Sequence, residues 1–136
     1  MNKKIKLLYI AHMDSIHSRR WIKYFVDKNH TVDVLYFDTT EETELTNIMA
    51  NVKFHRIKIK QYNNMPNILK YLFFRINVIT KVNKIKAIIR DINPDIIHVH
   101  FIDFWAYLAS NLNFPLVMTA WGSDILVFPK QIFLYR

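Results

Sequence analysis

Short apolar segments alternate with longer helical segments along this chain, and this order constrains the fold more than any other feature. The apolar segments are rich in β-branched and aromatic residues and end in polar turns, which is typical of buried strands. The predicted strands are Lys4–Ile10, Thr31–Phe37, Val52–Ile59, Ile96–Phe101 and Pro115–Ala120. Helices between such strands favour an α/β fold, a Rossmann-like, doubly wound parallel sheet, and the length of 136 residues fits a single domain spanning 1–136.

Three of the segments between the strands have helical periodicity. Residues 15–28 begin at a candidate N-cap, Ser15. The apolar face of this helix is predicted to consist of Ile16, Trp21, Ile22, Phe25 and Val26. Residues 68–92 form one helix or two and end at Asn93-Pro94, because the residue before a proline avoids the helical conformation. A short helix is expected over 104–112, and a polar surface connection over 38–51.

The chain contains a single glycine, Gly122, and no cysteine. The loop after the first strand, residues 11–18, therefore lacks the glycines that let a backbone approach a phosphate closely. Glycine-rich dinucleotide-binding proteins and P-loop NTPases are excluded on this ground. Without cysteine, disulfides and thiolate metal sites are excluded as well. Gly122 follows the last predicted strand, at the sheet edge where open α/β folds bind their ligands.

Other polar residues are expected near the same edge. His98 and His100 lie two apart on a strand and so share a face, but no third ligand completes a metal site, and none is predicted. His98 is expected to be a hydrogen-bonded core residue. His100, near the end of its strand, and Asp103, in the loop after it, are better placed to contact a substrate hydroxyl or phosphate.

The first predicted helix carries three basic or titratable residues near its start, His17, Arg19 and Arg20. Together with the helix N-terminus they would suit a phosphate or a carboxylate. The alternative is that the arginines are ordinary surface residues, and the sequence leaves both interpretations open.

The net charge of +8 is concentrated in the middle of the chain. Residues 45–90 contain ten Lys or Arg and no Asp or Glu. Such asymmetry points to an anionic partner, namely a membrane surface, a nucleic acid or a phosphorylated ligand, or else to a solvated basic face. Residues 68–92 interleave basic and bulky apolar residues, as in helices that lie on anionic bilayers. No recognisable element for reading nucleic acid is present, so no nucleic-acid partner is predicted.

The amino terminus does not have the pattern of a secretory signal. The apolar stretch behind it is interrupted at Lys6, and His12 and Asp14 follow within a few residues. No apolar run approaches the ~20 residues that cross a bilayer. We therefore expect a cytoplasmic protein, with peripheral contact to the inner face of the membrane as a further possibility.

Three motifs together resemble the amino-terminal, acceptor-side domain of family 4 glycosyltransferases with the GT-B fold. They are the segments 15–21 (SIHSRRW), 93–100 (NPDIIHVH) and 119–126 (TAWGSDIL), and the likeness covers nearly the whole chain. The resemblance implies transfer of a sugar from a nucleotide-sugar donor to a sugar or lipid-linked acceptor, without a metal or other cofactor. Family members often carry His where this chain has Trp121, which can stack on a sugar but cannot act as a base. Asp124 matches an acidic family position and is expected to order its loop.

The resemblance also implies a second, donor-binding domain, which residues 1–136 do not contain. We therefore expect an incomplete GT-B amino-terminal domain that is inactive alone. The alternatives are a non-catalytic interaction module and one subunit of a split glycosyltransferase, whose donor domain a second chain supplies. The candidate substrate-binding residues are His12, Asp14, His17, Arg19, Arg20, His100, Asp103, Trp121, Gly122, Ser123 and Asp124. The catalytic residues remain unassigned.

Overall fold

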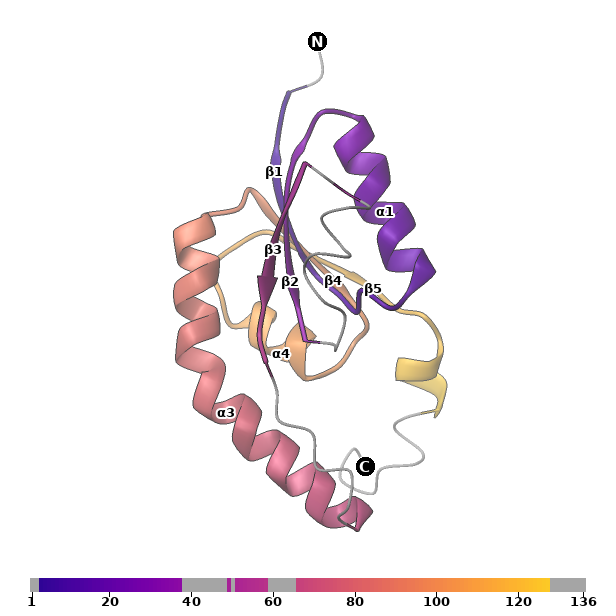
Figure 1. The fold of residues 1–136 in the computed structure, drawn as a ribbon, viewed down its shortest axis with the longest axis vertical. Helices are drawn as coiled ribbons and strands as arrows, with labels where there is room; N and C mark the ends of the chain where they lie inside the picture. The colour runs from indigo at the N-terminus through magenta and orange to yellow at the C-terminus, as the bar shows by residue number, and fades with distance from the viewer. Residues whose placement is uncertain (1–2, 38–48, 50, 59–65, 128–136) are drawn as a thin grey trace.

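The computed structural model describes residues 3–37, 49, 51–58 and 66–127. Within them, five parallel strands form one sheet in the order β3-β2-β1-β4-β5 (Figure 1). The strands are β1 (Lys6–Ile10), β2 (Thr31–Tyr36), β3 (Val52–Arg56), β4 (Ile96–His100) and β5 (Leu116–Thr119). The predicted Rossmann-like α/β fold with a parallel sheet is confirmed. Most of the predicted connection 38–51 and the last residue of the third predicted strand, Ile59, lie outside the described residues.

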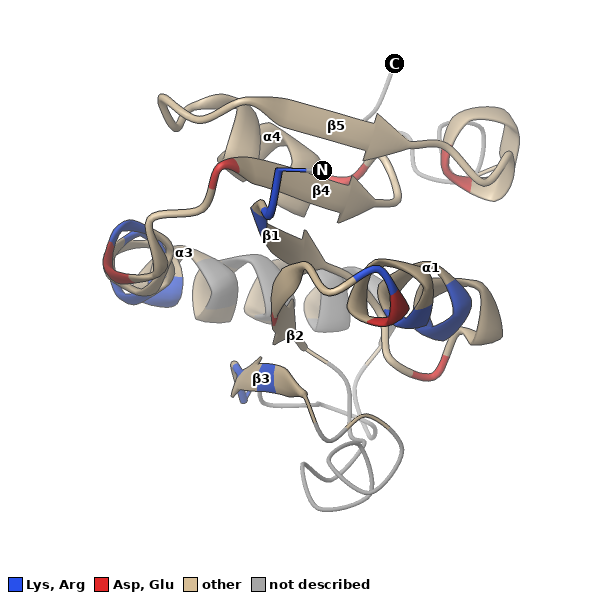
Figure 2. Ribbon diagram, turned by 90° about the horizontal axis from the view of Figure 1, so that it is seen from above, with Lys and Arg blue, Asp and Glu red and all other residues tan. Residues whose placement is uncertain are grey.

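Helices cover both faces of the sheet (Figure 2). They are α1 (Ile16–Asp27), α3 (Asn67–Ile92) and α4 (Phe104–Ser110), and a π-helical turn, η1 (Ser123–Val127), follows β5. On one face, Ile22 of α1 packs in a buried cluster with Leu7 and Tyr9 of β1. On the other face, α3 and α4 share a cluster with Leu8 and Ile10. Consecutive residues of β1 thus alternate between two cores, as the pleat of a strand requires.

Residues 67–92 form one continuous helix, α3, rather than two. It ends at Asn93, which adopts a left-handed conformation with φ 48° and donates its backbone N–H to the carbonyl of Ile89 at 3.0 Å. Asn tolerates this conformation better than most residues, and Pro94 prevents a further helical turn. The predicted stop at Asn93-Pro94 is confirmed.

The predicted apolar face of α1 is only partly buried. Ile22 is buried, whereas the side chain of Ile16, the first residue of α1, is 57% exposed. The ring of Trp21 lies nearly perpendicular to those of His98 and His100, at 5.5 and 6.1 Å, and the residue is 42% exposed. Ser15 precedes the helix as predicted, but its side chain makes no capping hydrogen bond.

The strand order contains a reversal that determines where a ligand can bind. The chain passes from β1 to β2 and β3 on one side, then crosses through α3 to β4 on the other side of β1. The loops after β1 and β4 therefore lead to opposite faces, and a crevice opens between them at the carboxyl ends of the two strands. Open α/β sheets bind their ligands at such a switch point.

The packing of α3 on the sheet generates the first prediction. Ile89→Ala removes a fully buried side chain and should lower the free energy of unfolding by about 2–5 kcal/mol. Ile79→Ala, on the exposed side of the same helix, should change it by less than about 0.5 kcal/mol. Urea unfolding followed by circular dichroism measures both changes, and equal effects of the two variants would contradict the packing described.

Candidate functional site

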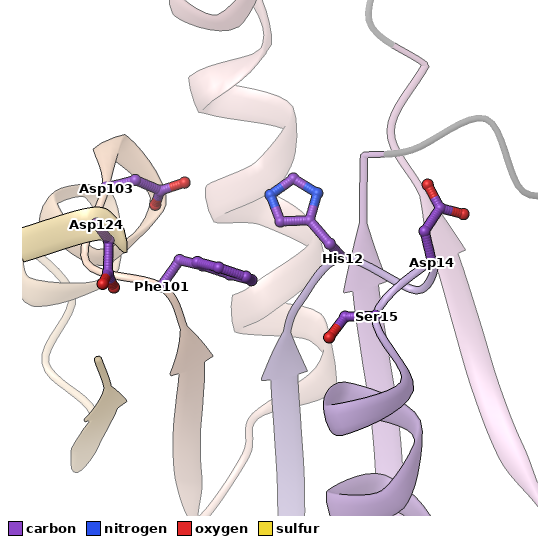
Figure 3. A pocket seen from close by; sticks show the side chains of 6 residues that line it. All are labelled: His12, Asp14, Ser15, Phe101, Asp103 and Asp124. Carbon is purple, nitrogen blue, oxygen red and sulfur yellow. The ribbon is translucent and has the colours of Figure 1, made fainter. Parts of the chain in front are cut away.

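A cleft of about 500 Å³ lies at the carboxyl ends of β1 and β4 (Figure 3). Its lining comes from three loops that are far apart in the sequence. The residues are His12, Asp14 and Ser15 after β1, Phe101 and Asp103 after β4, and Asp124 in η1. The structure therefore brings four of the predicted candidates, His12, Asp14, Asp103 and Asp124, to one cavity at the switch point of the sheet.

Asp124 connects two of these loops through hydrogen bonds to the backbone. Its carboxylate accepts one bond from the N–H of Ile102 at 2.8 Å and another from the N–H of Trp121 at 3.1 Å. The side chain is buried, and bonds from N–H groups to a charged acceptor are stronger than neutral ones. Asp124 thus fixes the β4–α4 loop against the turn after β5, which is the loop-ordering position expected for it.

Asp103 is the N-cap of α4 and also lines the cleft. Its carboxylate accepts the backbone N–H of Trp105 at 2.8 Å. Burial raises the pKa of Asp103 to about 6, although the backbone hydrogen bonds from Trp105 and Ala106 and the nearby His12 act in the opposite direction. The group therefore titrates close to neutral pH at the wall of the cavity.

Phe101 is a cleft residue that sequence reasoning missed. It follows β4 directly and has a backbone φ of 89°, a region that bulky side chains rarely occupy. Its N–H donates to the carbonyl of Thr119 at 3.0 Å, and its ring meets the ring of His12 edge-on at 5.3 Å. Strained residues of this kind cluster at functional sites. The sequence carries no signal for such a φ, because the conformation is imposed by the surrounding loops.

His98 and His100 lie on the α1 side of the sheet, beneath the cleft. His98 shares a 2.7 Å hydrogen bond with the hydroxyl of Thr119 and His100 a 3.1 Å bond with that of Ser18. Burial lowers the pKa of both residues, and burial together with the neighbouring His98 lowers the pKa of His100 to about 4. The prediction that His98 is a hydrogen-bonded core residue is confirmed.

His100 is not among the residues that line this cleft, and its contact with a substrate stays a prediction. It is almost completely buried, because α1 crosses over this face and places Ser18 and Trp21 on it. Its Nε2 has no hydrogen-bond partner within the described part of the protein. Its ring lies 5.8 Å from that of Trp121, so β4 and the turn after β5 do converge as the sequence indicated.

Trp121 and Gly122 lie in the turn between β5 and η1. The ring of Trp121 lies 4.8 Å from the ring of His17 at an angle of 31°, and its buried indole N–H has no partner among the residues described. Gly122 has φ 90°, and an added Cβ would meet nothing within 4 Å. The glycine is therefore needed for its backbone conformation and not for space. Ser123, the next candidate, is the first residue of η1.

The two arginines of the predicted anion site do not reach the cleft. The guanidinium of Arg19 donates through Nε to the carbonyl of Met13 and so holds the loop after β1. Arg20 is exposed on α1 and does not line the cavity. The structure therefore supports a structural position for Arg19 and a surface position for Arg20.

No group of three or more His, Cys, Asp or Glu in the described part of the chain is arranged to hold a metal ion. No helix among 3–37 and 66–127 combines the length and the apolar character needed to span a bilayer.

The sequence model of the family described as glycosyl transferase 4-like matches residues 6–136 of the chain. The match covers nearly all of it, so this protein belongs to that family. The predicted resemblance to family 4 glycosyltransferases is confirmed. A comparison with curated protein sequences finds no match.

Solved structures show the same fold at low sequence identity. UGT73P12 of Glycyrrhiza uralensis, in complex with glycyrrhetinic acid 3-O-monoglucuronide, is 13% identical with a TM-score of 0.58, over 85% of this chain and 28% of its own. A glycosyltransferase from Rickettsia africae is 17% identical with a TM-score of 0.54, over 86% of this chain and 30% of its own. The carboxy-terminal domain of the PF1911 hydrogenase of Pyrococcus furiosus is 12% identical with a TM-score of 0.61, over 88% of this chain and 94% of its own. This chain thus spans under a third of the two glycosyltransferases.

The loop contacts of Asp124 generate the second prediction. Asp124→Ala leaves two backbone N–H groups without their acceptor and should lower the free energy of unfolding by about 2–4 kcal/mol. Asp124→Asn keeps one acceptor oxygen and should cost less. Chemical unfolding measures both, with Asp91→Ala, an exposed carboxylate of α3, as the control. An unchanged stability of the Ala variant would show that the two loops are held by other contacts.

The raised pKa of Asp103 generates the third prediction. Its pKa is higher in the folded protein, about 6, than its ordinary value of 3.8, so the stability it contributes is present at low pH and lost as pH rises through 6. Asp103→Asn can still cap α4 but does not titrate. Between about pH 7 and about pH 4, the wild type should therefore gain about 2 kcal/mol relative to this variant.

Urea unfolding of both proteins across that pH range gives the difference directly. Taking the difference removes the opposite contribution of His100, whose lowered pKa destabilises the fold as pH falls. A difference that does not vary with pH would contradict the raised pKa of Asp103.

Proposed function

We propose that this chain binds the acceptor in a nucleotide-sugar-dependent glycosyl transfer. The observation that carries the proposal is the acidic lining of the cleft, to which three separate loops contribute Asp14, Asp103 and Asp124. A nucleotide-sugar donor carries a diphosphate, which a cavity lined by carboxylates repels. An uncharged sugar offers hydroxyl groups, which carboxylates accept as hydrogen-bond donors. The charge of the cleft therefore favours the acceptor over the donor.

The other groups of the cleft fit the same ligand class. Phe101 presents an aromatic side chain to the cavity, and Trp121 stands 6.5 Å from it between ring centroids. An aromatic ring can stack on the apolar face of a sugar ring. Asp103 has a pKa near neutral and so can exchange a proton with a hydroxyl, the step that an acceptor undergoes when it becomes a nucleophile.

The donor is expected to bind to a second lobe, whether further along the polypeptide or in another chain. The glycosyltransferases of similar fold are more than three times as long as the segment that this chain matches. Among the described strands, β5 pairs with β4 only, and Val117 and Met118 are half exposed on its two faces. This edge has the character of a surface that further structure covers. It fits a second lobe that covers this edge, whether in the same polypeptide or in another chain.

Ligand binding provides the fourth prediction. In ligand-observed NMR, the chain should bind a simple alkyl glycoside, a mimic of a lipid-linked sugar, in preference to UDP-glucose. His12→Ala should weaken glycoside binding by about tenfold, because it removes a hydrogen-bonding ring from the cleft. Arg20→Ala, outside the cleft, is the matched control and should bind like the wild type. Preference for UDP-glucose over the glycosides would overturn the acceptor assignment.

A transfer assay distinguishes a chain that is inactive alone from one that becomes active with a second polypeptide. The purified chain, given nucleotide-sugars and glycosides, should transfer no sugar, since a lone lobe neither excludes water nor gathers the donor. Transfer that appears only after addition of a polypeptide with a donor domain would support a split enzyme. Transfer by the chain alone would contradict the assignment of a half-site.

A further inference from the structure

Helix α3 is longer than the sheet it covers and extends past it (Figure 1). Its carboxyl-terminal turns pack on the sheet through Ile85, Ile89 and Ile92, which are buried. Its amino-terminal half instead presents large apolar side chains to solvent. Those described are Leu69, Leu72, Ile76 and Ile79, with exposed fractions of 42, 51, 48 and 59%. Four large exposed apolar residues on one helix are more than scattered surface residues explain.

The four residues form a single stripe. Their spacing alternates between three and four positions, which places them one above the other on one side of a helix. The same track continues toward the carboxyl end through Asn83, Lys86 and Arg90. This track is on the side turned away from Ile85 and Ile89, since its apolar members are exposed while those two are buried. One helix thus has a core side, and an outer stripe that changes from apolar to basic along its length.

The charge around the stripe discriminates between its potential occupants. No Asp or Glu occurs in residues 45–90, and exposed cations on α3, on β3 and just after β3 include Lys53, Lys58, Lys84 and Arg90. Asp91, next to Arg90, is the one acidic residue among the residues of α3 (Figure 2). Two copies of such a surface would repel one another if α3 paired with itself. An anionic bilayer can bind both the cations and the apolar stripe. Its phosphates attract the cations, and the apolar side chains insert at the boundary between headgroups and acyl chains.

We infer that α3 docks this protein on anionic lipid bilayers. Leu69, Leu72, Ile76 and Ile79 enter the boundary between headgroups and acyl chains, while Lys and Arg of α3 and β3 contact lipid phosphates. Because α3 runs back along the sheet before β4, its amino-terminal half lies toward the strand ends that carry the cleft (Figure 1). Docking would hold the cleft near the lipid surface. The inference does not depend on the proposed function, since it concerns a different element and needs no sugar.

Vesicle flotation of the whole chain tests this inference. The wild type should bind phosphatidylcholine vesicles that contain about one third phosphatidylglycerol, and bind pure phosphatidylcholine vesicles far less. The double variant Leu72→Ser/Ile76→Ser should lose about tenfold or more in affinity, because both side chains leave the acyl boundary. Arg90→Gln should lose about fivefold, and the loss should shrink as salt is raised.

Tyr24→Ser is the matched control, because Tyr24 is as exposed as the stripe residues but lies on α1, across the sheet from α3. It should bind like the wild type, and thermal unfolding should show that all variants remain folded. Equal binding to neutral and anionic vesicles would overturn the inference, as would unchanged binding of the double variant. A concentration-dependent dimer in sedimentation that the double variant abolishes would assign the stripe to a second copy of the chain instead.

Discussion

The parallel pairing of β1 with β4 is the constraint on which the rest of this structure depends. It joins two strands that are separated by more than half of the chain, and it places the loops after them side by side at one edge of the sheet. The crossover through α3 is required to return the chain to that edge. Without this pairing, His12 and Asp103 would have no common cavity. The cleft is thus a consequence of topology before it is a consequence of particular side chains.

The side chains then convert the crevice into a defined site. Asp124 holds the two later loops together through backbone hydrogen bonds, and Asp103 both ends a loop and begins a helix. Beneath them, His98 and His100 are kept neutral by burial, so they add hydrogen bonds but no positive charge to the site. A protonated pair at this position would partly neutralise the carboxylates above. Their low pKa preserves the acidic character that Asp14, Asp103 and Asp124 give the cleft.

Sequence reasoning was accurate where local chemistry decides the outcome. Strand patterns, the stop at Asn93-Pro94 and the convergence of the loops near His100 and Trp121 follow from periodicity, proline geometry and the parallel sheet. It could not specify burial that depends on which element covers a surface. Ile16 belongs to an apolar helical face yet is exposed, and His100 is covered by Ser18 of a helix whose position periodicity alone does not specify. The position of Phe101 in the cleft was not predicted either, because its positive φ depends on contacts between loops that are far apart in the sequence.

The structural neighbours show why the site, rather than the fold, must carry the functional argument. The hydrogenase domain resembles this chain with a TM-score of 0.61, above the 0.58 and 0.54 of the two glycosyltransferases. Similarity of fold is therefore shared with a protein whose name describes different chemistry, and fold alone does not imply function. Membership of the glycosyl transferase 4-like family comes from the sequence match over residues 6–136. What the structure adds is the charge of one cleft and the outer stripe of one helix, and these are properties that fold similarity alone does not specify.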